Sequence, residues 1–396
     1  MQFQLDIIQT LALAVVVLIV GEFIRKRVKV LEHFCIPAPV IGGILFSIIA
    51  LLGYTTQVFT FKFDDTLKNI FLITFFTTIG FTASLKLLKK GGAQVLIFLF
   101  ISMILVVVQN ALGIGMAQMF GLHPYIGLAI GSTPLVGGPG TAAAFGPLLE
   151  QNGGAAGAAT VAMAAATFGL VVGSLTGGPI AKRLIEKHHL HKKDANDEVA
   201  LSLVDQIRSL NGDSLFNSAI IIVIAMGLGS IISKYFVSLG WTFPPYIGGM
   251  LAAAIIRNVY DLLNKELILE EVEIIGNISL SFFLSMALMS LKLWELANLA
   301  LPMFAILVAQ VIIMALFAYF VVFRVMGKDY EAAVMASGTC GFGLGSTANA
   351  MANMDTLTNK YCRKAPRAYF AVPLVGSLFI DFFNAFAITY CINLFR

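Results

Sequence analysis

Two glycine-rich stretches of the chain have the composition of a binding site for small ions. The first, STPLVGGPGTAAAF (132–145), has three glycines and two prolines between Pro134 and Ala142. The second, GTCGFGLGSTANAMANM (338–354), mixes glycine with serine and threonine. Such composition breaks a helix and lets backbone N–H groups converge on an anion, while freed carbonyls can bind Na⁺. The candidate substrate-binding residues are Gly137, Gly138, Gly140, Thr141, Gly343, Gly345, Ser346 and Thr347.

A few polar side chains interrupt long apolar runs and are candidate Na⁺ ligands. Asp381 lies within GSLFIDFFNAF (376–386), and Asn384 follows it by one helical turn on the same face. Asn110 and Asn277 are further candidates, and Gln109 is another polar residue within a span. An ionisable residue at the centre of a bilayer costs roughly 2.5 to 3.5 kcal/mol on insertion scales, so a functional role is the first interpretation. The alternative is a structural hydrogen bond to a neighbouring helix.

The composition places these residues in a membrane. Of the 396 residues, 58% are hydrophobic and 12% are charged, whereas about 25% are charged in a soluble domain. Because one water-soluble core cannot bury so much apolar surface, we expect an all-α polytopic membrane protein in a lipid bilayer. The N-terminal apolar run lacks the features of a cleaved signal and predicts a retained first span. The four cysteines lack metal-binding or redox spacing, and we expect free thiols.

Hydropathy over windows of about 20 residues predicts ten membrane spans in two sets of five. The first set is 5–24, 36–53, 68–86, 94–120 and 158–181, and the second is 215–237, 245–262, 274–294, 299–326 and 368–395. We interpret the charged segment between them as a solvated linker, although its three histidines (His188, His189, His191) leave metal binding as an alternative. The predicted organisation is a first repeat (1–181), a linker (182–213) and a second repeat (214–396).

The two halves of the chain repeat each other in sequence. PVIGGIL aligns with PYIGGML, and SLKLLK with SLKLWE, both at an offset of 206 residues. GPGT (138–141) aligns with GLGS (343–346) at an offset of 205, so the glycine-rich stretches are twins. Because each repeat has an odd number of spans, the second must enter the membrane inverted relative to the first.

The distribution of charge predicts the orientation. With the N-terminus outside, 21 of the 26 Lys and Arg residues fall on the cytoplasmic side, as the positive-inside rule requires. We therefore expect both termini outside and the linker in the cytoplasm. Each glycine-rich stretch then lies between the fourth and fifth spans of its repeat. Irregular backbone is stable at membrane depth only where protein or a wet cavity covers it, which predicts two re-entrant loops at a transport site.

Other interpretations of the same features remain open. Glycines also let membrane helices pack closely, which we favour for the regular alanine-rich run 154–178. A non-transporting intramembrane enzyme is the alternative from another class. We do not expect an enzyme, because the sequence has no HExxH or GxSxG motif and no pair of intramembrane acids.

Longer strings resemble a known family. IPAPVIGG, QNALGIGMA, ATFGLVVGSLTGGP, GTCGFGLGSTANAMANM and FIDFFNA are similar to the bacterial sodium/glutamate symporters, and the resemblance runs nearly end to end. It implies Na⁺-coupled symport of L-glutamate across the bacterial inner membrane by two inverted five-span repeats. Similarity to the 2-hydroxycarboxylate transporters further implies a homodimer in which a core moves against a static scaffold, an elevator-type mechanism.

One position departs from the pattern of the family. Members often have histidine between the last two glycines of the first stretch, where this chain has Pro139. Proline also lacks an N–H donor. This departure keeps a Na⁺-coupled di- or tricarboxylate carrier as the alternative to a glutamate symporter.

Overall fold

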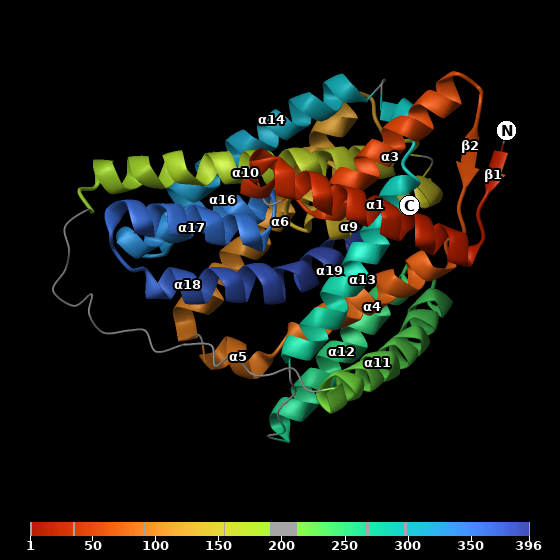
Figure 1. The fold of residues 1–396 in the computed structure, drawn as a ribbon. Coiled ribbons are helices and arrows are strands. Elements are labelled where there is room, and N and C mark those ends of the chain that lie inside the picture. The colour runs from red at the N-terminus through yellow and green to blue at the C-terminus, as the bar shows by residue number, and fades with distance from the viewer. Residues whose placement is uncertain are drawn as a thin grey trace.

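The structure, a computed structural model, describes residues 2–34, 36–90, 92–153, 155–190, 212–263, 265, 269–296 and 299–395. Helices make up almost all of it (Figure 1). The described residues include one short ribbon, in which β1 (Gln2–Gln4) pairs in parallel with β2 (Thr60–Lys62). Apart from this ribbon, the predicted all-α class is confirmed.

Each half of the chain contains long helices separated by shorter elements. The first half contains α1 (Ile7–Arg27), α2 (Lys29–His33), α3 (Ala38–Thr55), α4 (Thr66–Thr82), α5 (Leu85–Lys90), α6 (Gly92–Met119), α7 (Pro124–Ala129), α8 (Ser132–Leu135), α9 (Gly138–Gly153) and α10 (Ala158–Lys187). The second contains α11 (Gly212–Ser238), α12 (Pro245–Leu262), α13 (Leu269–Met289), the 3₁₀ turn η1 (Leu293–Leu296), α14 (Ala300–Leu316), α15 (Phe323–Val325), α16 (Tyr330–Leu344), α17 (Thr347–Tyr361), α18 (Pro366–Pro373) and α19 (Ile380–Leu394).

Two long helices of the second half are continued through π-helical turns. η2 (Phe317–Val322) joins α14 to α15, and η3 (Leu374–Phe379) joins α18 to α19. π-helical turns are rare overall, and those that occur are often found at functional sites. The second of them lies directly before Asp381, which is the second residue of α19.

Nine helical segments in the described part of the chain are long and apolar enough to cross a membrane. They correspond to nine of the ten predicted spans. The tenth, 245–262, does form a helix with the expected bounds, α12, but this helix is not among the nine. Within it, Arg257 and Asp261 form a largely buried ion pair at 3.2 Å. α10 extends to Lys187 and α11 begins at Gly212. Most of the predicted linker between them, including His191, lies outside the described residues.

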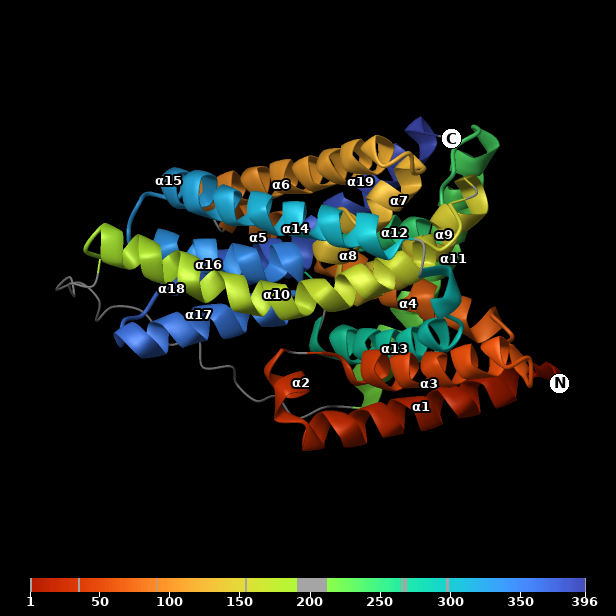
Figure 2. The same ribbon diagram turned by 90° about the horizontal axis from the view of Figure 1, so that it is seen from above.

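The helices pack in two groups that each draw on both halves of the chain. The first three long helices of each half, α1, α3, α4, α11, α12 and α13, pack against one another, and we name them the flanking group. The others, α6–α10, α14 and α16–α19, form the central group. Figure 2 shows α1, α3 and α13 running along one side of α10. The two groups meet where α9 and α19 contact α13, α12 and α4.

Close contacts between glycines hold the flanking group together. A Cβ on Gly229 of α11 would overlap the backbone of Gly249 in α12, and one on Gly248 would overlap the carbonyl of Gly229. On the other face of α12, a Cβ on Gly80 of α4 would overlap the carbonyl of Met250. Small residues let helix backbones approach closely in membranes, so these positions set how tightly α11, α12 and α4 pack.

The α11–α12 contact predicts the effect of adding a side chain. Gly229→Val should lower the free energy of unfolding by about 1 to 3 kcal/mol or more, because the helices must separate to admit it. Gly227→Val is the matched control in the same helix, since a Cβ there meets nothing within 4 Å. The measurement is the midpoint of thermal denaturation of each purified variant in detergent. Equal midpoints for the two variants would contradict this packing.

Candidate functional site

The twin glycine-rich stretches meet in space. A Cβ on Gly138 would lie 3.1 Å from the carbonyl oxygen of Gly345. A cavity of about 590 Å³ opens beside this contact. Eight of the twelve residues proposed from the sequence line it: Gly137, Gly138, Gly140, Gly345, Ser346, Thr347, Asn277 and Asp381. We name it the site cavity.

Two of the proposed substrate-binding residues lie outside the lining of this cavity. Thr141 is buried one turn into α9 and packs against Gly137. Gly343 is buried in the last turn of α16, where its carbonyl accepts a hydrogen bond from Nε2 of Gln109 at 2.7 Å. Both residues therefore pack within the protein next to the helix interruptions and do not line the cavity.

The glycine-rich stretches are more helical than the sequence suggested. The expected irregular loops reduce to short interruptions between helices, one after α8 at residues 136–137 and one between α16 and α17 at residues 345–346. Gly138 begins α9 with a φ of 62°, a left-handed conformation that favours glycine. Pro139 falls in the first turn of α9, where the missing N–H costs the helix nothing. The prolines thus mark helix starts, which is why they do not destroy the helices.

Two helix N-termini supply the positive potential of the cavity. α9 has 16 residues and α17 has 15, and both begin at its lining. The first N–H groups of a helix have no partner within it, and the peptide dipoles add partial positive charge there. At α17, one of these N–H groups, that of Asn349, donates to the Ser346 hydroxyl at 3.3 Å. The remainder are available to an anion.

The charged side chains that line the cavity are all acidic. They are Asp381 from α19 and Glu273 from α13, and none of the described lining residues is Lys, Arg or His. An anion in this cavity therefore depends on backbone N–H groups, because the Thr78 hydroxyl already donates to the Phe75 carbonyl at 2.7 Å. The carboxylates suit a cation or an ammonium group.

The two other proposed Na⁺ ligands lie in a separate buried cluster around Ser132. The Ser132 hydroxyl lies 2.8 Å from Oδ1 of Asn110 and 2.6 Å from Oδ1 of Asn384. Both amides are oriented by the backbone of Ser132, because its N–H donates to Asn110 Oδ1 at 3.0 Å and its carbonyl accepts from Asn384 Nδ2 at 3.1 Å. One hydroxyl proton can satisfy only one of two amide oxygens. Three side-chain oxygens thus converge, and each amide oxygen has a donor, because the Ser132 N–H serves Asn110 and the hydroxyl proton can serve Asn384.

Two glutamines join the two halves near this cluster. Gln310 Nε2 donates to the carbonyl of Gln109 at 2.8 Å, and Gln109 in turn donates to Gly343. The side-chain oxygens of both glutamines are buried without a partner among the described residues. The sequence pointed to Gln109 only as a polar residue within a span, and neither Ser132 nor Gln310 was proposed. Their signal is positional, since Ser132 is the first residue of the first glycine-rich stretch and Gln310 is a polar residue within a predicted span.

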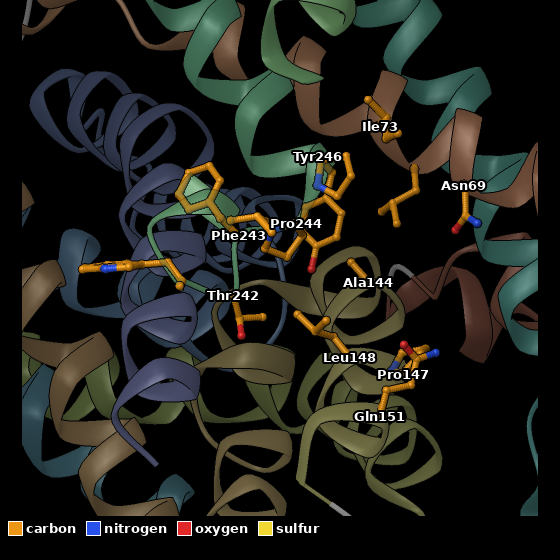
Figure 3. A pocket seen from close by; sticks show the side chains of 15 residues that line it. Asn69, Ile73, Ala144, Pro147, Leu148, Gln151, Thr242, Phe243, Pro244 and Tyr246 are labelled. Atoms are coloured by element: carbon orange, nitrogen blue, oxygen red, sulfur yellow. The ribbon is translucent and has the colours of Figure 1, made fainter. Parts of the chain in front are cut away.

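A second, larger cavity of about 710 Å³ contains none of the proposed site residues. Figure 3 shows Asn69 and Ile73 of α4 on one side of it, Ala144 and Leu148 of α9 on another, and Tyr246 between them. None of its described lining residues is charged. We name it the far cavity.

The contact between the twin stretches can be tested at Gly138. Gly138→Ala should lower stability by about 1 to 2 kcal/mol through its left-handed backbone and by more through the clash with Gly345. Gly121→Ala is the matched control, because Gly121 has a φ of 69° and a Cβ there meets nothing within 4 Å. Thermal denaturation in detergent should give a lower midpoint for Gly138→Ala. If Gly121→Ala lowered the midpoint as much, the two stretches would not be in contact.

Comparison with known proteins identifies the family. The family model described as sodium/glutamate symporter matches residues 3–363. The sodium/glutamate symporter of Escherichia coli (strain K12) is 41% identical over 391 residues, which are 98% of this chain and 97% of that protein. The protein of the same name from Haemophilus influenzae is 38% identical over 97% of this chain and 96% of its own length. The chain belongs to the sodium/glutamate symporter family.

Proposed function

We propose that the protein carries L-glutamate into the cell together with Na⁺, and that the site cavity holds the substrate. The observation that carries this proposal is the meeting of two helix N-termini beside a carboxylate, Asp381. The family and the names of the relatives support the same activity. The protein acts as a carrier in this proposal and not as an enzyme.

The chemistry of glutamate matches the cavity. Its two carboxylates are acceptors for the N–H groups at the starts of α9 and α17, and its ammonium group is a donor for Asp381 or Glu273. Gly137, Gly138, Gly140, Gly345, Ser346 and Thr347 are the substrate-binding residues in this proposal, with Thr141 and Gly343 supporting them. A tricarboxylate would bring more negative charge to a cavity whose charged side chains are acidic. The structure therefore favours glutamate over the di- or tricarboxylate alternative, even with Pro139 in the first stretch.

Na⁺ has two candidate positions. One is in the site cavity, where Asp381 and Asn277 supply oxygen ligands. The other is the cluster of Asn110, Ser132 and Asn384, where three side-chain oxygens converge. Na⁺ prefers such hard oxygen ligands.

Transport energetics favour at least two ions. A tenfold Na⁺ gradient supplies about 1.4 kcal/mol for each ion, and moving one net charge through 100 mV supplies about 2.3 kcal/mol. One Na⁺ with the singly negative glutamate is electroneutral and supports only about tenfold accumulation. Two Na⁺ supply about 5 kcal/mol and support accumulation of several thousandfold. The two candidate positions match this requirement.

The membrane arrangement in this proposal follows from the repeat. The two halves are inverted five-span repeats in the bacterial inner membrane, with α7–α9 and α16–α17 as re-entrant segments and both termini outside. In support, Figures 1 and 2 show the two chain ends toward the same end of the molecule. The central group moves against the flanking group in an elevator-type cycle, and two copies form a homodimer. The packing of helices into two groups supports this division.

Uptake into proteoliposomes tests the function and the role of Asp381 together. The wild-type protein should accumulate labelled L-glutamate when a Na⁺ gradient is applied and should not accumulate labelled citrate or succinate. Asp381→Asn should reduce this uptake at least tenfold or raise the Na⁺ concentration needed for half-maximal rate, because it removes the negative charge that holds Na⁺ or the ammonium group.

The matched control is Asp355→Asn. Asp355 is an exposed carboxylate of α17 that accepts a hydrogen bond from the Tyr369 hydroxyl, so the same chemical change occurs outside the cavity. Size-exclusion chromatography shows whether each variant is folded. An unchanged rate and Na⁺ dependence in Asp381→Asn would remove Asp381 from the mechanism, and uptake independent of Na⁺ in the wild type would overturn the proposed function.

A further inference from the structure

The site cavity and the far cavity lie one after the other along the same two helices. On α4, Asn69 and Ile73 line the far cavity, and Phe75 and Thr82 line the site cavity. On α9 the order is reversed, because the first turn lines the site cavity and the later residues from Ala144 onward line the far cavity. The two cavities therefore lie toward opposite ends of α4. Together they would form a passage if nothing filled the space between them.

Three aromatic rings pack together where the two sets of lining residues meet along α4 and α9. Phe76 of α4, Phe145 of α9 and Tyr246 of α12 have exposed fractions of 1%, 0% and 6%. The ring of Tyr246 lies 5.0 Å from that of Phe76 and 5.3 Å from that of Phe145, measured between centroids, and the two phenylalanine rings are 6.5 Å apart. Figure 3 shows Tyr246 at the edge of the far cavity. We name these three residues the aromatic barrier.

The barrier is buried and nearly free of polar groups. Its one polar atom, the Tyr246 hydroxyl, is buried without a partner among the described residues. A Na⁺ ion or a glutamate that passed between these rings would lose its hydration without gaining ligands, which is prohibitively costly. Hydrophobic constrictions close pores to ions for this reason.

The barrier also lies on the boundary between the two helix groups. Phe145 belongs to α9 of the central group, the helix that begins at Gly138 in the site cavity. Phe76 and Tyr246 belong to the flanking group. The helix that binds substrate at its first turn thus carries, two turns later, the ring that seals the boundary.

We propose that Phe76, Phe145 and Tyr246 couple Na⁺ movement to substrate movement by keeping the site cavity sealed from the far cavity. This inference rests on the proposed Na⁺-coupled transport and adds to it the residues that prevent a leak. The rings seal the cavities from each other by filling space, and the Tyr246 hydroxyl does not contribute to this seal.

The test is ²²Na⁺ entry into proteoliposomes in the absence of glutamate. Phe145→Ala should raise this entry at least tenfold over the wild type and should reduce the accumulation of glutamate, because the space left by the ring admits water and Na⁺. Phe145→Leu, which keeps most of the volume and is safer for folding, should raise ²²Na⁺ entry severalfold. Tyr246→Phe keeps the ring, and its ²²Na⁺ entry should equal that of the wild type.

Phe98→Ala is the control for loss of a buried ring elsewhere. Phe98 of α6 is fully buried against Phe342 of α16, away from both cavities, and its truncation should leave ²²Na⁺ entry unchanged. The barrier would be overturned if folded Phe145→Ala or Phe145→Leu protein admitted no more ²²Na⁺ than the wild type. It would also be overturned if Phe98→Ala raised ²²Na⁺ entry as much as Phe145→Ala does. Because the assay contains no glutamate, it decides the barrier separately: a wild type without Na⁺-dependent glutamate uptake would overturn only the proposed function.

Discussion

Backbone polar groups at membrane depth must be satisfied within the protein, and this constraint shapes the whole structure. Each half of the chain interrupts a helix at a glycine, and the freed groups would cost several kcal/mol each in contact with lipid. The two interruptions are placed against each other, with Gly138 beside the carbonyl of Gly345, and the central helices surround them. The open side faces the site cavity, where a polar ligand can satisfy the remaining N–H groups.

The charge of the cavity follows from the same arrangement. Because helix N-termini provide the positive potential, the cavity needs no basic side chain to hold an anion, and its charged lining residues, Asp381 and Glu273, are acidic. Partial charges at helix ends are weaker than a full charge, so two nearby carboxylates would repel an anionic substrate unless a cation accompanied it. In this account the dependence on Na⁺ is a consequence of how the cavity is built.

Much of the fold could be predicted from the sequence, because membrane spans and repeats leave long, regular patterns. Nine of the ten predicted spans meet the criterion for crossing a membrane, and the twin stretches, matched only by an offset of 205 residues, lie in contact. The helical content of those stretches was not predicted, since tertiary packing overrides the local effect of Pro139 and the glycines. The cluster around Ser132 and the pairing of Gln310 with Gln109 also escaped prediction. They depend on side chains more than 20 and 200 residues apart in the chain, and sequence pattern alone does not show which of these face each other.

Equilibrium binding of glutamate to the purified protein tests the central claim most directly. Labelled L-glutamate is titrated at increasing Na⁺ concentration, with choline keeping the ionic strength constant. If helix N-termini and Na⁺ together hold the substrate, the affinity rises with Na⁺, by about tenfold per tenfold increase in Na⁺ for each ion bound with glutamate, and binding is lost in choline alone. Equal affinity in choline and in Na⁺ would show that the protein holds glutamate without the cation, and would contradict the account.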